Sequence, residues 1–324
     1  AVNSAHTNDT LQDIATELAP ERAAHSDNIS LNADLYARVK AVYDQRDELD
    51  LDPEQLKLLE ETHKGFIRSG VSLEGEAQAR LREINAELAE LSLNFSQNLL
   101  DETNDFELHV TDSADLGELM PAQVQAAASE AQRRGHDSGW SFTLQRPSIN
   151  PFLQYSPNRE LRREIYMGYA MRGDNDKDNK AILSRMAALR SERAALMDYE
   201  THAHFVLSDN MAETPDRVYE FLDQIWTPAL RVAMSERAAL QRMMRQDGVS
   251  GQLEGWDWRH YSEKVRKAQF DIDEVALRAY FEVNAVRDGA FQIANNLWGL
   301  TFTELPDLPR WHPDQQAFEV KEAD

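Results

Sequence analysis

Histidine is the residue type through which this chain could bind a metal ion and use it for chemistry. The sequence has nine histidines and no cysteine, so thiolate ligands and cysteine nucleophiles are excluded. A zinc peptidase helix requires His-Glu-x-x-His, in which two imidazoles on one helical face ligate the ion and the glutamate acts as base. None of the nine histidines is followed or preceded by glutamate. We therefore predict neither catalytic residues nor metal ligands in the chain.

Other histidine positions offer weaker chemistry. His202 and His204 could present two imidazoles on one face only in an extended strand, because side chains two residues apart diverge on a helix. The surrounding sequence favours a helix, so surface or packed histidines explain this pair better. His260 and His312 could each hydrogen-bond a peptide backbone, but a buried histidine with a satisfied hydrogen bond accounts for them more simply.

Aromatic side chains gather between residues 256 and 314, a segment that holds four of the six tryptophans. A cluster of this kind marks either a core or the wall of a site. Trp256, Tyr261 and Arg266 combine aromatic faces with a guanidinium that can bind a carboxylate at two points, so they are our candidates for a substrate channel. The alternative is that the same three residues lock a pair of helices together.

The charge balance excludes several classes of partner. The chain has 57 acidic and 34 basic residues and a formal net charge of −23, which repels phosphate backbones and anionic lipid headgroups. We therefore expect no nucleic-acid partner and no membrane partner. No stretch approaches the roughly 20 apolar residues that cross a bilayer. The absence of cysteine fits a reducing compartment, so a cytoplasmic location is expected.

Helix-forming residues dominate the composition, and the chain is predicted to be an all-α, multi-helix protein with a small β ribbon. The strongest pattern contains Leu81, Ile84 and Leu88 in an a/d stripe that requires a neighbouring helix. Asp52 and Gly70 predict the start and the end of an earlier helix. Helical spacing of apolar residues predicts helices at about 11–20, 31–43, 53–70, 72–100, 121–134, 182–198, 215–226, 230–247, 261–269 and 274–300.

The helical pattern breaks between residues 105 and 157, where the chain could be subdivided. Segments 106–110 and 140–144 alternate apolar and polar residues and predict the two strands of the ribbon. Pro147 and Pro151 then predict a passage rich in loops.

The last fifty residues combine a helix with two further strands. Asp271 and Asp273 predict the N-cap and first turn of the helix over 274–300. Segments 301–305 and 317–320 are predicted strands, and the second is predicted to have no partner.

Short motifs along almost the whole chain resemble one family, the thimet oligopeptidase and neurolysin family of zinc metallopeptidases, and within it the peptidyl-dipeptidases (dipeptidyl carboxypeptidases). Each motif alone is weak, and the combination is specific. The matching motifs are Ala5-His6-Thr7-Asn8-Asp9, Leu11-Gln12, Arg190-Ser191-Glu192-Arg193-Ala194-Ala195-Leu196, Met211-Ala212-Glu213-Thr214-Pro215, Trp256-Asp257-Trp258 with Tyr261, Glu263 and Arg266, Tyr280-Phe281, Gly299-Leu300-Thr301-Phe302, and His312-Pro313-Asp314.

The resemblance implies a fold that is almost entirely helical, with two halves around a channel that admits short peptides. It implies that residues 1–324 are the N-terminal, channel-wall portion, itself not catalytic, of an enzyme that releases dipeptides from the C-terminus of oligopeptides. The expected partners are short peptides and the catalytic half of the same polypeptide. Zinc is expected in the intact enzyme and not in this chain, because the family's zinc motif lies downstream of the matched region.

Two positions depart from the family pattern, and one alternative function stays open. Asp198 stands where the family usually has glycine, and His260 stands where it usually has an aromatic residue. Neither change affects the expected fold, but the second puts a substrate contact near His260 in doubt. The alternative is a stand-alone helical protein that binds peptides or acts as a scaffold.

Overall fold

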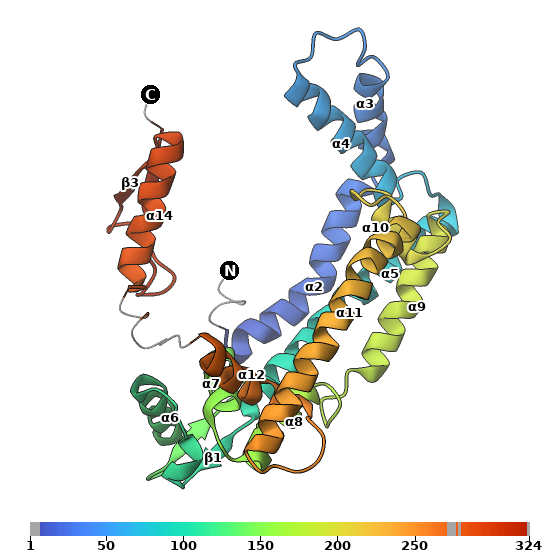
Figure 1. Cartoon of the computed structure of the whole chain (residues 1–324). Helices are drawn as coiled ribbons and strands as arrows, with labels where there is room; N and C mark the ends of the chain where they lie inside the picture. The colour runs from blue at the N-terminus through green and yellow to red at the C-terminus, as the bar shows by residue number, and fades with distance from the viewer. Residues whose placement is uncertain (1–6, 271–276, 278–279, 323–324) are drawn as a thin grey trace.

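The computed structural model describes residues 7–270, 277 and 280–322, and this part of the chain is predominantly helical with two small antiparallel ribbons (Figure 1). The predicted fold class is therefore confirmed. The helices are α2 (Asp9–Ser30), α3 (Ala33–Tyr43), α4 (Pro53–Ser69), α5 (Gly75–Asp105), α6 (Pro121–Arg133), α7 (Arg146–Tyr155), α8 (Arg159–Ala170), α9 (Lys180–Leu196), α10 (His202–Leu207), α11 (Pro215–Gln246), α12 (Gly255–Phe270) and α14 (Val283–Trp298), with a 3-10 turn η1 (Ser113–Leu116). The strands are β1 (Leu108–Val110), β2 (Trp140–Phe142), β3 (Thr301–Glu304) and β4 (Phe318–Lys321).

The long helix α5 has the neighbours that its apolar stripe requires. It packs between α2 and α9, and the three helices run side by side in Figure 1. Ile84 and Leu88 of α5 form one buried cluster with Met186 and Leu189 of α9. The stripe therefore makes an intramolecular core, as predicted.

Helix α4 begins and ends at the residues that the sequence indicated. The side chain of Asp52 accepts a hydrogen bond from the backbone of Gln55, whose side chain in turn accepts one from the Asp52 backbone. This reciprocal capping box satisfies two backbone donors that the first turn leaves unpaired. Gly70 ends the helix in the left-handed conformation, with φ +94°.

Proline interrupts fewer helices than the sequence indicated. Helix α2 was predicted to stop near Pro20, but it continues to Ser30 because it packs on α5 on both sides of the proline. Gln97 of α5 donates hydrogen bonds to the first half of α2, and Asn85 of α5 donates one to Asp27 in the second half. Tertiary packing here outweighs the backbone hydrogen bond that a proline removes.

The same correction applies to two later helices. The passage predicted to be loop around Pro147 and Pro151 is the helix α7, because one proline occupies its first turn and the apolar face of the helix is buried. The two helices predicted at 215–226 and 230–247 are the single helix α11, which runs through Pro228. The freed carbonyl near Pro228 lies on an exposed part of the helix, where water can bind it.

Both ribbons pair antiparallel. In the first, Leu108 pairs with Phe142 and Val110 with Trp140, which confirms the predicted ribbon. In the second, β3 pairs with β4, so the prediction of an unpartnered strand at the end of the chain is wrong. The Phe302 ring of β3 stacks on Phe291 of α14, and the Phe318 ring of β4 meets Phe291 edge-on. These contacts supply the apolar packing that a two-stranded ribbon needs.

The C-terminal ribbon and α14 form a small unit that stands apart from the helical body in Figure 1. The helix predicted over 274–300 is described from Val283 onward. Its predicted cap at Asp271 and Asp273 lies outside the described residues.

The largest buried core lies where the first ribbon meets α6, α7 and α8. Its members are apolar residues from both strands, the three helices, η1 and the connections between these elements: Leu108, Val110, Leu116, Leu119, Ala127, Phe142, Leu144, Ile149, Phe152, Leu153 and Ile165. This core fixes the surface on which α12 packs, because α12 contacts α7, α8 and α11.

Candidate functional site

Helix α12 begins earlier than the predicted range 261–269, so the whole Trp256 to Tyr261 motif is helical. The helix begins at Gly255, where a Cβ atom would lie 2.3 Å from the hydroxyl oxygen of Tyr166. Any larger residue would displace the Tyr166 ring of α8. The helix consequently has a buried face that includes Asp257 and His260, and an exposed face that includes Trp258.

A buried ion-pair network holds the start of α12 against α8. The carboxylate of Asp257, fully buried, accepts hydrogen bonds from the Arg159 side chain at 2.8 and 3.0 Å and from Arg162 Nη2 at 3.1 Å. Burial alone would raise the pKa of Asp257, but hydrogen bonds from Arg159, the Glu254 backbone amide and Arg162 outweigh burial and lower it. The carboxylate is therefore ionised and compensates the charge of Arg162, which is itself only 1% exposed.

His260 and Tyr261 lie on the buried side of α12. His260 Nδ1 donates a hydrogen bond to the backbone carbonyl of Gln154 at 3.1 Å. Burial, with the nearby positive charges of Arg162 and Lys264, lowers the pKa of His260 to about 4, so the ring is neutral near pH 7. Tyr261 is 2% exposed and belongs to the core between α11 and α12. Both side chains contribute to packing between helices.

Trp256 lies between charged and aromatic neighbours on α8. The guanidinium carbons of Arg159 and Arg163 are 5.8 and 5.7 Å from its ring, and the Tyr166 ring meets it edge-on at 6.1 Å. Its indole Nε1 is buried and has no hydrogen-bond partner among the described residues. An unpaired buried donor costs on the order of 1–3 kcal/mol, which the packing of the ring against α8 must offset.

Arg266, the third predicted residue, lines a hollow of about 660 Å³ on the exposed side of α12. Its Nε and Nη2 bind the two oxygens of Glu263 at 2.7 and 2.6 Å, and Gln154 donates a third hydrogen bond to that carboxylate at 2.9 Å. The guanidinium fork of Arg266 is thus bound to an internal carboxylate. The hollow is lined by Gln154, Tyr166, Gly255, Trp258, Arg259, Ser262, Glu263 and Arg266.

Arg259 supplies a positive charge to the same surface, and the sequence pattern gave no reason to single it out. It also lines an adjoining hollow of about 320 Å³ with Arg146, Asn150 and the phenols of Tyr166 and Tyr169. Within the described part of the chain, neither Arg259 nor Arg146 has an ion-pair or hydrogen-bond partner. Two unneutralised guanidiniums on a chain of net charge −23 can bind a carboxylate.

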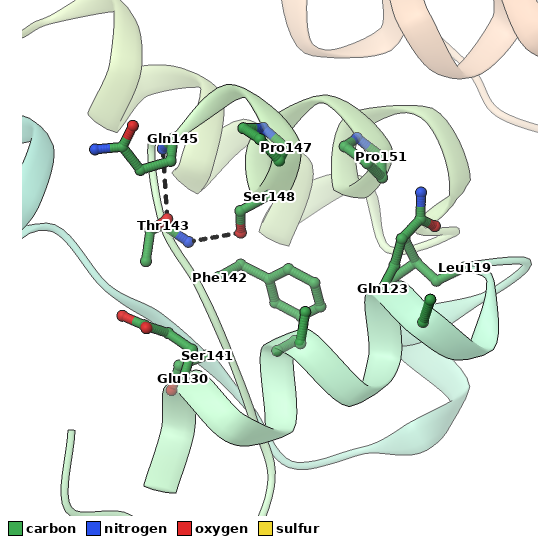
Figure 2. Close-up of a pocket in the computed structure, with 13 residues that line it drawn as sticks. Leu119, Gln123, Glu130, Ser141, Phe142, Thr143, Gln145, Pro147, Ser148 and Pro151 are labelled. Carbon is green, nitrogen blue, oxygen red and sulfur yellow. Dashed lines mark hydrogen bonds between the residues drawn. The ribbon is translucent and has the colours of Figure 1, made fainter. Parts of the chain in front are cut away.

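A separate hollow of about 490 Å³ lies between α6 and α7, beside β2 (Figure 2). Pro147 and Pro151 of α7 line one side of it, and Gln123 of α6 faces them. Its polar edge is occupied by internal hydrogen bonds, since the Thr143 amide donates to Ser148 Oγ at 3.0 Å. This hollow lacks the unpaired charged groups of the α12 surface.

Comparison with known proteins gives relatives along the full chain. Residues 152–324, more than half of the chain, match the model of Peptidase family M3. The chain is similar to dipeptidyl carboxypeptidase of Escherichia coli (strain K12), with 35% identity covering 99% of this chain and 47% of the relative. It is also similar to oligopeptidase A of Salmonella typhimurium, with 30% identity covering 98% and 48%. A third relative is the organellar oligopeptidase A of Arabidopsis thaliana, with 30% identity covering 95% and 40%.

The chain thus spans about half the length of the curated relatives it matches. None of the described helices combines the length and the apolar composition that a membrane crossing requires. The order of the matched motifs, the helical architecture and the identity along the full chain agree with one another. The chain belongs to Peptidase family M3.

Proposed function

We propose that this chain is the helical wall of a peptidase that releases dipeptides from the C-terminus of oligopeptides, and that a second half of the same polypeptide carries the catalytic site. The observation that carries this proposal is the 35% identity to dipeptidyl carboxypeptidase, over 99% of this chain and only 47% of the relative. In the intact peptidase, zinc would polarise the scissile carbonyl. The chain has no His-Glu-x-x-His motif to hold this catalytic ion, because none of its histidines is directly next to a glutamate in the sequence.

An uncovered apolar face on α11 supports a missing partner. Every residue from 219 to 238 is exposed, although this stretch is helical and rich in large apolar side chains. Soluble monomers rarely expose apolar patches of this size, and each such side chain gains roughly 1.5–3 kcal/mol on full burial. The exposed apolar residues are Tyr219, Phe221, Leu222, Ile225, Trp226, Leu230, Val232 and Met234. We assign the catalytic half as the surface that covers them.

The two adjoining hollows beside α12 supply the peptide-binding part of the proposal. Arg259 and Arg146 would bind the C-terminal carboxylate of the peptide, and Trp258, which is 40% exposed, would cover an apolar side chain. Arg266 would line this surface together with Glu263. Trp256 and Tyr261 would act behind it by holding α12 in place. We extend the proposal to a cytoplasmic location, which the composition without cysteine favours.

The first test is the intact mass and activity of the native polypeptide purified from its source. We expect a mass well above 37.0 kDa and the release of dipeptides from an N-acetylated hexapeptide, both detected by mass spectrometry. A chelator should abolish this activity, and the purified 1–324 chain should show none. Internal cleavage of the hexapeptide would contradict dipeptide release. A native mass near 37.0 kDa without activity would instead favour the stand-alone peptide-binding protein.

A second test concerns the carboxylate contact. In the native polypeptide, Arg259→Gln should raise KM at least about 10-fold for a peptide with a free C-terminus, because one charge-assisted hydrogen bond is worth roughly 1.5–3 kcal/mol. The same variant should change KM little for the C-terminally amidated peptide. Arg133→Gln is the matched control, since Arg133 is an exposed residue that pairs with Glu130 on α6. An equal change for both peptides would overturn the assigned contact.

A further inference from the structure

Three potential metal ligands meet at the first ribbon, far from the α12 surface in the sequence. Glu107 directly precedes β1, His109 lies within β1, and His136 lies in the connection between α6 and β2. Residues two apart in an extended chain share one face, so the strand itself brings Glu107 and His109 together. One ligand atom from each of the three residues lies within 4.8 Å of the others.

The hydrogen bonds around the cluster fix which ring nitrogens can accept a metal ion. Ser141 Oγ, on β2, donates to Glu107 Oε1 and therefore accepts from His109 Nδ1 at 3.1 Å. In the neutral His109 ring this leaves the lone pair on Nε2. His136 Nε2 donates a hydrogen bond to Glu107 Oε1 at 2.9 Å, and the two imidazoles stack with centroids 3.8 Å apart. Metal-bound histidines are commonly oriented by a second hydrogen bond of the kind that His109 Nδ1 makes with Ser141.

The cluster is accessible, and the backbone beside it leaves room at the ring. The side chains of His136 and Glu107 are 35% and 24% exposed, so an ion can reach them from solvent. Gly139 has φ +92°, and a Cβ atom there would lie 2.8 Å from His109 Nε2. A side chain at this position would therefore clash with the His109 ring, and glycine avoids the clash.

We propose that Glu107, His109 and His136 bind a divalent transition-metal ion of the zinc type. Two imidazoles and a carboxylate are ligands that suit this class, and a water would complete a four-coordinate site. Metal–nitrogen bonds of about 2.0–2.1 Å place tetrahedral ligand atoms roughly 3.3 Å apart, so side-chain rotation must bring ligand atoms that now lie within 4.8 Å of one another closer by as much as about 1.5 Å. The ion takes the position between His136 Nε2 and Glu107, and the hydrogen on Nε2 moves to Nδ1.

The bound ion joins the start of the ribbon to the connection that precedes β2. The ion thereby stabilises the ribbon beside the largest core, in which Leu108 and Phe142 of the same strands are buried. This site differs from the expectation that the chain binds no metal. It is independent of the proposed peptidase activity, because its ligands lie outside the peptide-binding surface and outside any His-Glu-x-x-His motif.

The test uses the 1–324 chain after removal of metals with a chelator. The stripped protein is incubated with zinc chloride or cobalt chloride and desalted, and its metal content is measured by mass spectrometry of the element. We expect one ion per chain, visible absorption of four-coordinate cobalt, and a higher Tm in the presence of zinc. His109→Ala and His136→Ala should each weaken binding at least about 10-fold.

Two further variants separate the site from incidental binding and from misfolding. Glu107→Gln can still accept the hydrogen bonds from Ser141 and His136 but lacks the charge, so it should weaken binding while circular dichroism stays unchanged. His204→Ala is the matched control, because His204 belongs to the other closely spaced histidine pair and should leave binding unaltered. Metal content well below one ion per chain, or equal affinity in His136→Ala, would overturn the proposal and leave the cluster as a hydrogen-bonded contact of the ribbon.

Discussion

The junction of α8 with α12 and residues 219–238 of α11 differ in how far their side chains are buried. At the junction, Asp257 and Arg162 are buried and paired, and Tyr261 is in the core. Along α11, residues 219–238 are all exposed, including Trp226 at 63%. The same helix then enters the core at Leu240 and Met244.

An amphipathic pattern therefore predicts that one face of a helix is buried. It does not show whether that face packs within the chain or against another protein surface. At the junction every buried charge finds its counterpart within the chain. On α11 the apolar stripe has the composition of a packed helix, yet residues 219–238 are exposed in the part of the chain that the structure describes. We therefore expect substitutions at the junction to affect the stability of the isolated chain strongly, and substitutions on exposed α11 to affect it weakly.

The largest effect is expected from Asp257→Asn. This substitution leaves the guanidinium of Arg162 buried without its carboxylate, which typically costs about 3–5 kcal/mol. The measurement is urea denaturation of the 1–324 chain. Asp44→Asn, at the C-terminal end of α3, is the control. The ion pair of Asp44 with Lys40 is exposed, so its loss should change the free energy of unfolding by no more than the experimental error. If Asp257→Asn lowered the free energy of unfolding by less than about 1 kcal/mol, the ion pair would not be buried as described.

A pH-dependent effect of intermediate size is expected from His260. Its pKa is about 4 in the folded chain against 6.5 ordinarily, so between these pH values the unfolded chain binds a proton that the folded chain does not. The free energy of unfolding should therefore decrease as pH falls from 6.5 to about 4. Since one pKa unit corresponds to about 1.4 kcal/mol, the total decrease should be on the order of 3 kcal/mol.

His260→Asn tests this assignment. Asparagine can place an amide donor near the position of Nδ1, so the hydrogen bond to Gln154 is kept while the titration is removed. The free energy of unfolding, measured by urea titration at several pH values, should lose this component of its slope. An unchanged slope in the variant would assign the pH dependence to other groups.

The smallest effect is expected on the exposed part of α11. Trp226→Ala should change the stability of the 1–324 chain by less than about 0.5 kcal/mol, because the side chain has little to lose on unfolding. Leu240→Ala, on the same helix and 4% exposed, should cost about 2–5 kcal/mol. Thermal and urea denaturation of the pair measure the difference. Similar losses for both variants would show that residues 219–238 are packed in solution.

Much of the fold followed from local chemistry. The Asp52 cap, the Gly70 stop, the α5 stripe and each strand of the first ribbon are specified by local residue patterns. Helices through proline were missed, because packing on a distant helix decides whether the chain continues past Pro20. The pairing of β3 with β4 was missed, although these strands lie closer together in the chain than the two strands of the first ribbon.

The candidate site was predicted less completely, because side-chain availability depends on neighbours that the sequence does not place. Arg266 lines a hollow but is bound to Glu263, whereas Arg259 lines the same hollow without an internal carboxylate. Family resemblance did identify one special backbone position. Asp198, where the family usually has glycine, has φ +60°, the left-handed conformation that glycine adopts most easily.

Pro228 has a consequence for how α11 opens. A proline has no amide hydrogen and leaves the carbonyl four residues before it without a helical partner, so cooperativity between successive turns is weakest there. Among the described residues, the segment before Pro228 also contributes no side chain to a buried core, whereas the segment after it ends in the buried Leu240 and Met244. In hydrogen-exchange terms, α11 should behave as two units, with the first exchanging its amides far faster than the second. Docking of another protein surface on the first unit would slow its exchange to match the second.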